Sequence, residues 1–107
     1  MTDSRLDPIL GALAHPRRIA VMRCLTSEYL PIPVPSFATY LALSLFADAE
    51  ADDFEEFRSE VHDSLYHVHL PILAEAGIVD YDPDLADGVI DEGPEFETAV
   101  ALLEASE

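Results

Sequence analysis

The chain has 107 residues, a length that supports one folded domain, because two separate cores would each bury too little surface. Half of the residues are hydrophobic, which excludes a disordered chain, while 22 acidic residues against five arginines give a formal net charge of −17. We therefore expect a single domain over residues 1–107.

The acidic surplus, together with the absence of lysine, is typical of proteins that stay soluble in concentrated KCl. In dilute salt so much negative charge opposes compaction and repels nucleic acid. In molar salt the Debye length falls to about 3 Å, so both penalties largely disappear. We therefore predict a halophilic protein. The composition leaves one alternative open, an acidic protein of an ordinary cytoplasm, such as a nucleic-acid mimic or an acidic adaptor.

The sequence carries no signal for a membrane, a disulfide or a metal. The N-terminus lacks the basic and then apolar pattern of a signal peptide, and the longest apolar stretch, residues 37–47, is too short to span a bilayer. Cys24 is the single cysteine, so an internal disulfide is excluded, and we expect an inert thiol in the core. We predict a cytoplasmic protein without a cofactor.

The N-terminal third predicts two short helices followed by an extended segment. Pro8 and Pro16 each suit the first turn of a helix, and the second helix should run to about residue 25. The alternating prolines that follow forbid a helix but tolerate an edge strand, which we place at residues 32–34. Ser36 can then cap a third helix. Its inward face would consist of Phe37, Tyr40, Leu41 and Leu45.

A long helix is predicted over residues 57–76, after an acidic loop or frayed start at residues 48–56. Four apolar residues recur at the spacing of one helical face, namely Val61, Leu65, Val68 and Ile72. Pro71 lies inside this pattern and should kink the helix, so that Leu70 and Leu73 can join the core beyond it. Gly77 suits the C-terminal cap.

Two strands and a last helix complete the predicted order. Residues 78–82 and 89–90 read as strands, joined by an acidic, solvated turn. The last helix should cover about residues 94–105, with an apolar face of Phe96, Val100 and Leu103. No later element can cover this face, so we expect a second copy to bury it in a homodimer. The alternative is that its own core does so.

This order of elements predicts an α+β fold, mainly helical, of the winged helix-turn-helix type. In such a fold the third helix positions the fourth, the fourth enters the major groove, and the hairpin forms the wing. A short edge strand, a two-stranded wing and a C-terminal helix would complete it.

Two segments carry a family resemblance. Residues 10–19 read Leu-Gly-Ala-Leu-Ala-His-Pro-Arg-Arg-Ile and resemble the opening of ArsR-like winged-helix regulators. Residues 65–71 and 76–82 read Leu-Tyr-His-Val-His-Leu-Pro and Ala-Gly-Ile-Val-Asp-Tyr-Asp, similar to a family of short haloarchaeal winged-helix proteins. The resemblance implies a winged-helix fold and a role in transcription. A basic residue is common in that family where Ile72 stands here, so we expect no phosphate contact at this position.

The candidate DNA-binding residues fall into two groups. The side chains expected to face base edges from the long helix are Ser59, Asp63, Ser64 and His67. Those expected to contact phosphates are Arg17, Arg18, Ser36, Thr39 and Arg58. Each group has a structural alternative. The helix face can be a solvated acidic surface, and the paired arginines can form salt bridges with the plentiful carboxylates.

The sequence therefore favours a DNA-binding transcriptional regulator that acts on double-stranded DNA as a homodimer. Glycine-rich phosphate loops and nucleophile–base spacings are absent, so we do not expect an enzyme. His62 and His69, two turns apart on one predicted face, are too few for a zinc site. The alternative function is a winged-helix module that binds a protein partner and no longer binds DNA.

Overall fold

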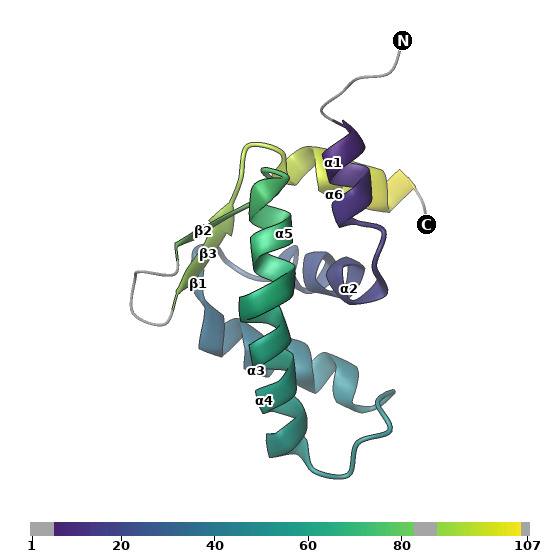
Figure 1. Cartoon of the computed structure of the whole chain (residues 1–107), viewed down its shortest axis with the longest axis vertical. Coiled ribbons are helices and arrows are strands. Elements are labelled where there is room, and N and C mark those ends of the chain that lie inside the picture. Colours follow the sequence, from purple (N-terminus) through teal and green to yellow (C-terminus); the bar gives the residue numbers. More distant parts are fainter. Residues whose placement is uncertain (1–5, 83–87, 106–107) are drawn as a thin grey trace.

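The computed structural model describes residues 6–82 and 88–105 and shows an α+β fold that is mainly helical (Figure 1). Three helices and one short strand form the first half of the chain. These elements are α1 (Leu6–Ala12), α2 (Pro16–Leu25), β1 (Ile32–Pro33) and α3 (Val34–Phe46). The second half consists of α4 (Phe54–Ser64), the π-helical turn η1 (Leu65–His69), α5 (Leu70–Glu75), β2 (Val79–Asp82), β3 (Val89–Glu92) and α6 (Phe96–Ala105).

The three strands form one antiparallel sheet in the order β1-β3-β2. Ile90 of β3 lies opposite both Ile32 of β1 and Tyr81 of β2. The predicted edge strand and hairpin are thus confirmed. β1 is only two residues long because α3 begins at Val34, whose N–H donates to the carbonyl oxygen of Gly88 at 3.0 Å. The predicted turn between β2 and β3 falls on residues 83–87, outside the described residues.

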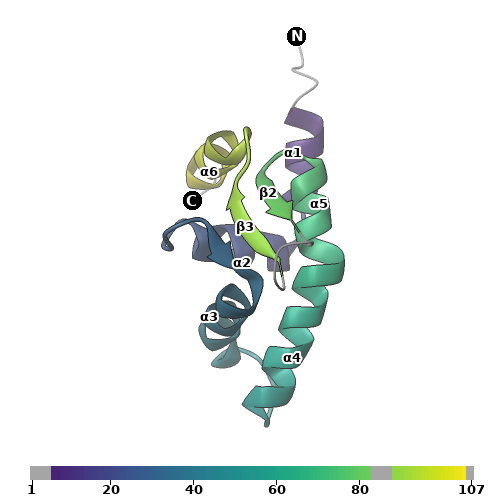
Figure 2. The same ribbon diagram turned by 90° about the vertical axis from the view of Figure 1, so that its left-hand side faces the viewer.

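The core lies between the long helix, the sheet and helices α1 to α3. Figure 2 shows α4 and α5 as one rod along one side of the molecule, with α3 packed beside α4 and the sheet beside α5. The largest fully buried side chains include Ile9, Met22, Leu25, Phe37, Leu41, Leu65, Leu70, Leu73, Ile78 and Ile90. No helix among residues 6–82 and 88–105 has the length and apolar character that a membrane span requires.

The long helix is interrupted by a π-helical turn just before Pro71. The N–H of Leu70 donates to the carbonyl oxygen of Leu65, five residues back, in place of the usual four. The extra residue rotates everything after it by about 100°, so the buried positions fall one residue later than in a regular helix. The core side therefore carries His69 and Leu73, where the spacing had indicated Val68 and Ile72.

The predicted inward position of Val68 is therefore wrong, since its side chain is 46% exposed. Ile72 is half-buried. The prediction that Leu70 and Leu73 join the core near Pro71 is confirmed. After α5, Gly77 adopts a φ of +78°, and the N–H of Ile78 donates to the carbonyl oxygen of Leu73 at 3.0 Å, so glycine ends the helix as expected.

Two predictions about α3 are wrong. Pro33 occupies the position before the helix, and no side chain caps it, so Ser36 lies in the first turn and is not the cap. This happens because the extended Pro33 leads directly into Val34, and Pro35 needs no hydrogen-bond acceptor in the first turn. Tyr40, expected inside, is 37% exposed, and its hydroxyl lies 3.1 Å from that of Ser27.

The turn from β3 into α6 depends on a glycine that allows two backbone segments to approach. A Cβ atom on Gly93 would lie 2.4 Å from the carbonyl oxygen of Gly77. Gly93→Ala should therefore lower the free energy of unfolding by about 1–3 kcal/mol. Gly11, in helix α1, has nothing within 4 Å of such an atom, so Gly11→Ala should stabilise the protein by about 0.5 kcal/mol.

Urea denaturation of both variants at a fixed KCl concentration measures these effects. Equal stability of Gly93→Ala and the parent chain would contradict the close approach of the two segments.

Candidate nucleic-acid interface

Helix α4 presents a polar face to solvent. Asp53 starts the helix by accepting hydrogen bonds from the N–H groups of Glu55 and Glu56, at 3.0 and 3.3 Å. Val61 turns inward, which leaves the opposite side to polar residues. The exposed side chains include Ser59, Glu60 and Asp63 of α4, and His67 follows them in η1. Three of the four expected base-reading residues thus lie exposed along the long helix.

Ser64, the fourth expected base contact, is half-buried. Its hydroxyl donates to the carbonyl oxygen of Val61 at 3.2 Å. It lies toward the start of α2 and lines a cavity there with His15 and Arg17. Ser64 therefore lies apart from the outer face that the other three residues share.

Arg58, the expected phosphate contact on α4, is paired with a carboxylate one turn earlier. Its Nη2 and Nε atoms lie 2.9 and 3.3 Å from the Oε2 atom of Glu55. The side chain stays 34% exposed, so the pair is open to solvent. An approaching phosphate would have to share this guanidinium with Glu55.

The two neighbouring arginines of α2 have separate environments. The Nε atom of Arg18 donates to the carbonyl oxygen of Ala12 at 2.5 Å, and its Nη1 atom lies 3.5 Å from the Nδ1 atom of His69. Arg18 thus lies at the negative end of α1, and among the described residues no carboxylate pairs with it, so the alternative of a salt bridge finds no support there. Arg17 lines the cavity beside Ser64, and among the described residues its guanidinium has no carboxylate partner.

The hydroxyl groups at the start of α3 differ in accessibility. Thr39 is half-buried, and its hydroxyl donates to the carbonyl oxygen of Pro35 at 3.1 Å. The same proton therefore cannot be donated to a phosphate. Ser36 is exposed in the first turn and can meet a phosphate. Only one of these two expected phosphate contacts is therefore available.

An aromatic cluster that the sequence did not predict joins the long helix to the hairpin. The ring of Tyr66 lies 5.9 Å from that of Tyr81 in an edge-to-face contact, and 6.2 and 5.1 Å from His62 and His67. Burial raises the pKa of Tyr81 to about 12, so its hydroxyl remains protonated. The cluster fixes the angle between the hairpin and the exposed helix face.

The π-helical turn separates the two histidines that were expected to share one face. His62 stacks on Tyr66, whereas His69 is only 6% exposed and packs against His15, with ring centroids 5.1 Å apart. Within residues 6–82 and 88–105 no three metal-ligating side chains come together. Burial, and then the nearby charges of His15 and the two arginines, lower the pKa of His69 from 6.5 to about 4.

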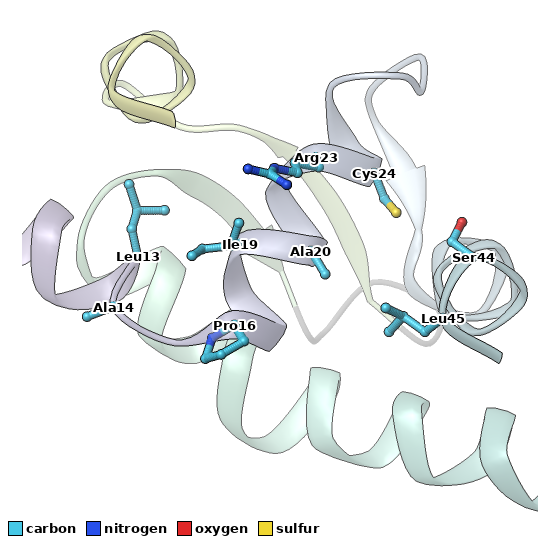
Figure 3. A pocket seen from close by; sticks show the side chains of 9 residues that line it. All are labelled: Leu13, Ala14, Pro16, Ile19, Ala20, Arg23, Cys24, Ser44 and Leu45. Carbon is cyan, nitrogen blue, oxygen red and sulfur yellow. The ribbon is translucent and has the colours of Figure 1, made fainter. Parts of the chain in front are cut away.

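A largely apolar groove of about 720 Å³ lies between α3 on one side and α2 with the turn before it on the other. Figure 3 shows Leu13 and Ile19 on one side of it and Ser44 and Leu45 on the other, with the sulfur of Cys24 turned toward Ser44. Cys24 is half-buried, so it lines this groove and is not the enclosed core thiol that we expected. Burial raises the pKa of its thiol, which keeps it protonated and unreactive.

Helix α6 packs against the core of its own chain. Phe96 and Ala99 are buried, and Val100 and Leu103 are half-buried against the same core. The helix begins at Phe96, two residues later than Pro94, which had indicated its start. Its own core therefore covers much of the apolar face that was expected to remain for a second copy.

The neutral, buried His69 makes stability depend on pH. Its pKa is lower in the folded chain than in the unfolded one, so its stabilising contribution is complete above pH 6.5 and is lost as pH falls toward 4. His69→Gln cannot take up this proton. The difference in free energy of unfolding between the parent chain and His69→Gln should shrink by roughly 2 kcal/mol over that range.

Urea denaturation at several pH values measures this difference. His62→Gln, the same substitution outside the cavity, serves as the control. A difference for His69→Gln that stays constant with pH would contradict the assignment.

One protein family accounts for most of the chain. Comparison with curated proteins and with solved structures gives no match. A family model described as a domain of unknown function matches residues 10–89, which contain α2, the whole long helix, β1 and β2. The matched region covers about three quarters of the 107 residues and ends before α6. The chain belongs to this family, DUF7344.

Proposed function

We propose that the protein is a DNA-binding transcriptional regulator with a winged helix-turn-helix fold. In this proposal α3 and α4 form the helix-turn-helix, α4 enters the major groove, and the β2–β3 hairpin is the wing. The observation that carries it is a polar helix face, exposed along α4, with α3 packed against the other side of α4 and β2 beside α5, the continuation of the same rod. We infer that the protein acts by binding and not by catalysis.

The exposed face carries groups that can read base edges. Ser59 can donate or accept a hydrogen bond, and Asp63 can accept one from the amino group of cytosine. His67 can donate to a base or to a phosphate. The spacing of four residues between successive members places them on successive turns, which is the arrangement that a helix lying in a groove requires.

The scarcity of free positive charge on α4 means that affinity for DNA cannot depend mainly on ion pairs with phosphates. Arg58 is shared with Glu55, and Glu60 and Asp63 add negative charge to the same helix. Affinity would therefore come from direct hydrogen bonds, apolar contact, water and cations that bridge carboxylates to phosphates. Molar KCl screens the repulsion, and counterion release adds little under these conditions.

The alternative function, a module that binds a protein partner, is favoured by two observations. The carboxylate of Glu55 already neutralises the positive charge of Arg58. Apolar side chains are also exposed, Leu43 of α3 at 61% and Val68 of η1 at 46%. Such side chains suit the centre of a protein interface better than a phosphate-facing surface.

Fluorescence anisotropy in molar KCl, with labelled DNA from upstream of the gene, tests the regulator. His67→Ala and Arg58→Ala should each weaken binding about tenfold, because each removes a contact worth about 1–3 kcal/mol. Arg23→Ala removes the same charge from the apolar groove and should leave binding unchanged.

Two results would count against the regulator, and a third against the bridging cations alone. Folded protein that binds neither this DNA nor a random pool would favour the protein-binding module. Equal weakening by Arg23→Ala would show a non-specific charge effect. Affinity that collapses steeply as KCl rises would exclude bridging cations.

We further propose that the regulator is a homodimer formed through α6. Val100 and Leu103 keep part of their surface accessible after packing on their own core. The double variant Val100→Ser, Leu103→Ser should therefore halve the mass measured by sedimentation equilibrium in molar KCl. A parent chain that sediments as a monomer at every concentration would reject the dimer.

A further inference from the structure

A cavity of about 320 Å³ lies between the start of α2 and the long helix. It borders the outer face of α4 at Glu60 and is built by the turn before α2, the first turn of α2, α4 and η1. The lining residues are His15, Pro16, Arg17, Glu60, Ser64 and His69. Its volume is many times the roughly 30 Å³ that one water molecule occupies, so a small ion can enter together with water.

Hydrogen bonds determine which nitrogen of each histidine carries the proton. The Nδ1 atom of His15 accepts from the backbone N–H of Arg17 at 3.1 Å, and the Nδ1 atom of His69 faces the Nη1 atom of Arg18 at 3.5 Å. A backbone amide and a guanidinium can only donate, so both Nδ1 atoms are acceptors. In a neutral imidazole the proton then sits on Nε2. Both rings therefore offer an Nε2–H donor.

The cavity concentrates donors and positive charge in a strongly acidic protein. Among the described residues the guanidinium of Arg17 has no carboxylate partner, and the Nε2 atom of the nine-tenths buried His69 has no hydrogen-bond partner. The start of α2 adds the positive end of a helix dipole. Glu60 is the only carboxylate in the lining, and it lies on an exposed part of α4.

We propose that this cavity binds a phosphate group, held by the guanidinium of Arg17 and by the Nε2–H groups of His15 and His69. A tetrahedral oxyanion accepts from several directions at once, which matches donors that arrive from α2 and η1. The site goes beyond the proposed DNA contacts of α4, because it needs no base. The phosphate can be a free anion or part of a DNA backbone beside the long helix.

The four histidines of the chain provide the readout. Histidine ring signals are followed by NMR while inorganic phosphate is added at a fixed molar KCl concentration. The signals of His15 and His69 should shift and saturate, whereas those of His62 and His67, outside the cavity, should not move. Equal movement of all four signals, or movement of none with either phosphate or duplex DNA, would overturn the proposal.

Variants distinguish phosphate binding in this cavity from a general effect of net charge. Arg17→Gln should weaken phosphate binding about tenfold, because a charged hydrogen bond is lost. Arg23→Gln removes the same charge from the same helix but lies on the apolar groove, so it should bind as the parent does. Glu60→Gln should bind more tightly, since the one opposing carboxylate is removed. Unchanged binding by Arg17→Gln would overturn the proposal.

His15→Asn keeps an N-terminal cap for α2, and its shorter side chain withdraws the Nε2–H donor from the cavity. It should therefore weaken phosphate binding while leaving the fold unchanged, as measured by circular dichroism. Phosphate binding as tight as that of the parent would remove His15 from the site.

A second titration with duplex DNA distinguishes the source of the phosphate. Shifts of His15 and His69 with duplex alone would assign the cavity to the DNA backbone, and shifts with both would show that a free anion also enters. Shifts with inorganic phosphate from a protein that binds no DNA would support the cavity and reject the regulator. The two proposals can therefore fail independently.

Discussion

The missing backbone N–H of Pro71 is the constraint on which the arrangement of the long helix depends. A regular helix would bring the proline ring against the carbonyl group of His67, four residues earlier. The π-helical turn over residues 65–69 accommodates the ring and shifts the following side chains around the helix axis. His69 thereby turns toward α2 and Val68 toward solvent.

That rotation also creates the polar contacts between the long helix and the start of α2. Because His69 points inward, it meets His15 and Arg18, and Arg18 reaches the last carbonyl group of α1. The turn between α1 and α2 is thus tied to the middle of the long helix. A helix without the π-helical turn would leave Arg18 without this neighbour.

The large negative net charge is a second constraint, because it limits where the molecule can bind an anion. Acidic side chains dominate the exposed surface of α4, and its one arginine is paired within the helix. Arg17 and Arg18 lie together where α2 begins, and Arg17 lines the cavity there. Charge that is distributed in this way can hold an anion locally while the molecule as a whole stays strongly negative.

Sequence patterns alone determined the elements and their order. Prolines, glycine and apolar spacing predicted the helices and strands apart from the π-helical turn, an edge strand at residues 32–34 that proved one residue shorter, and the end of the helix at Gly77, because these depend on local backbone chemistry. Only the tertiary structure decided which side chains meet. A period of 3.6 residues cannot foresee an inserted residue, so Val68 was misplaced and the cluster around His69 was missed. The pairing of Tyr66 with Tyr81, and of Arg18 with Ala12, likewise depends on how separate elements pack together.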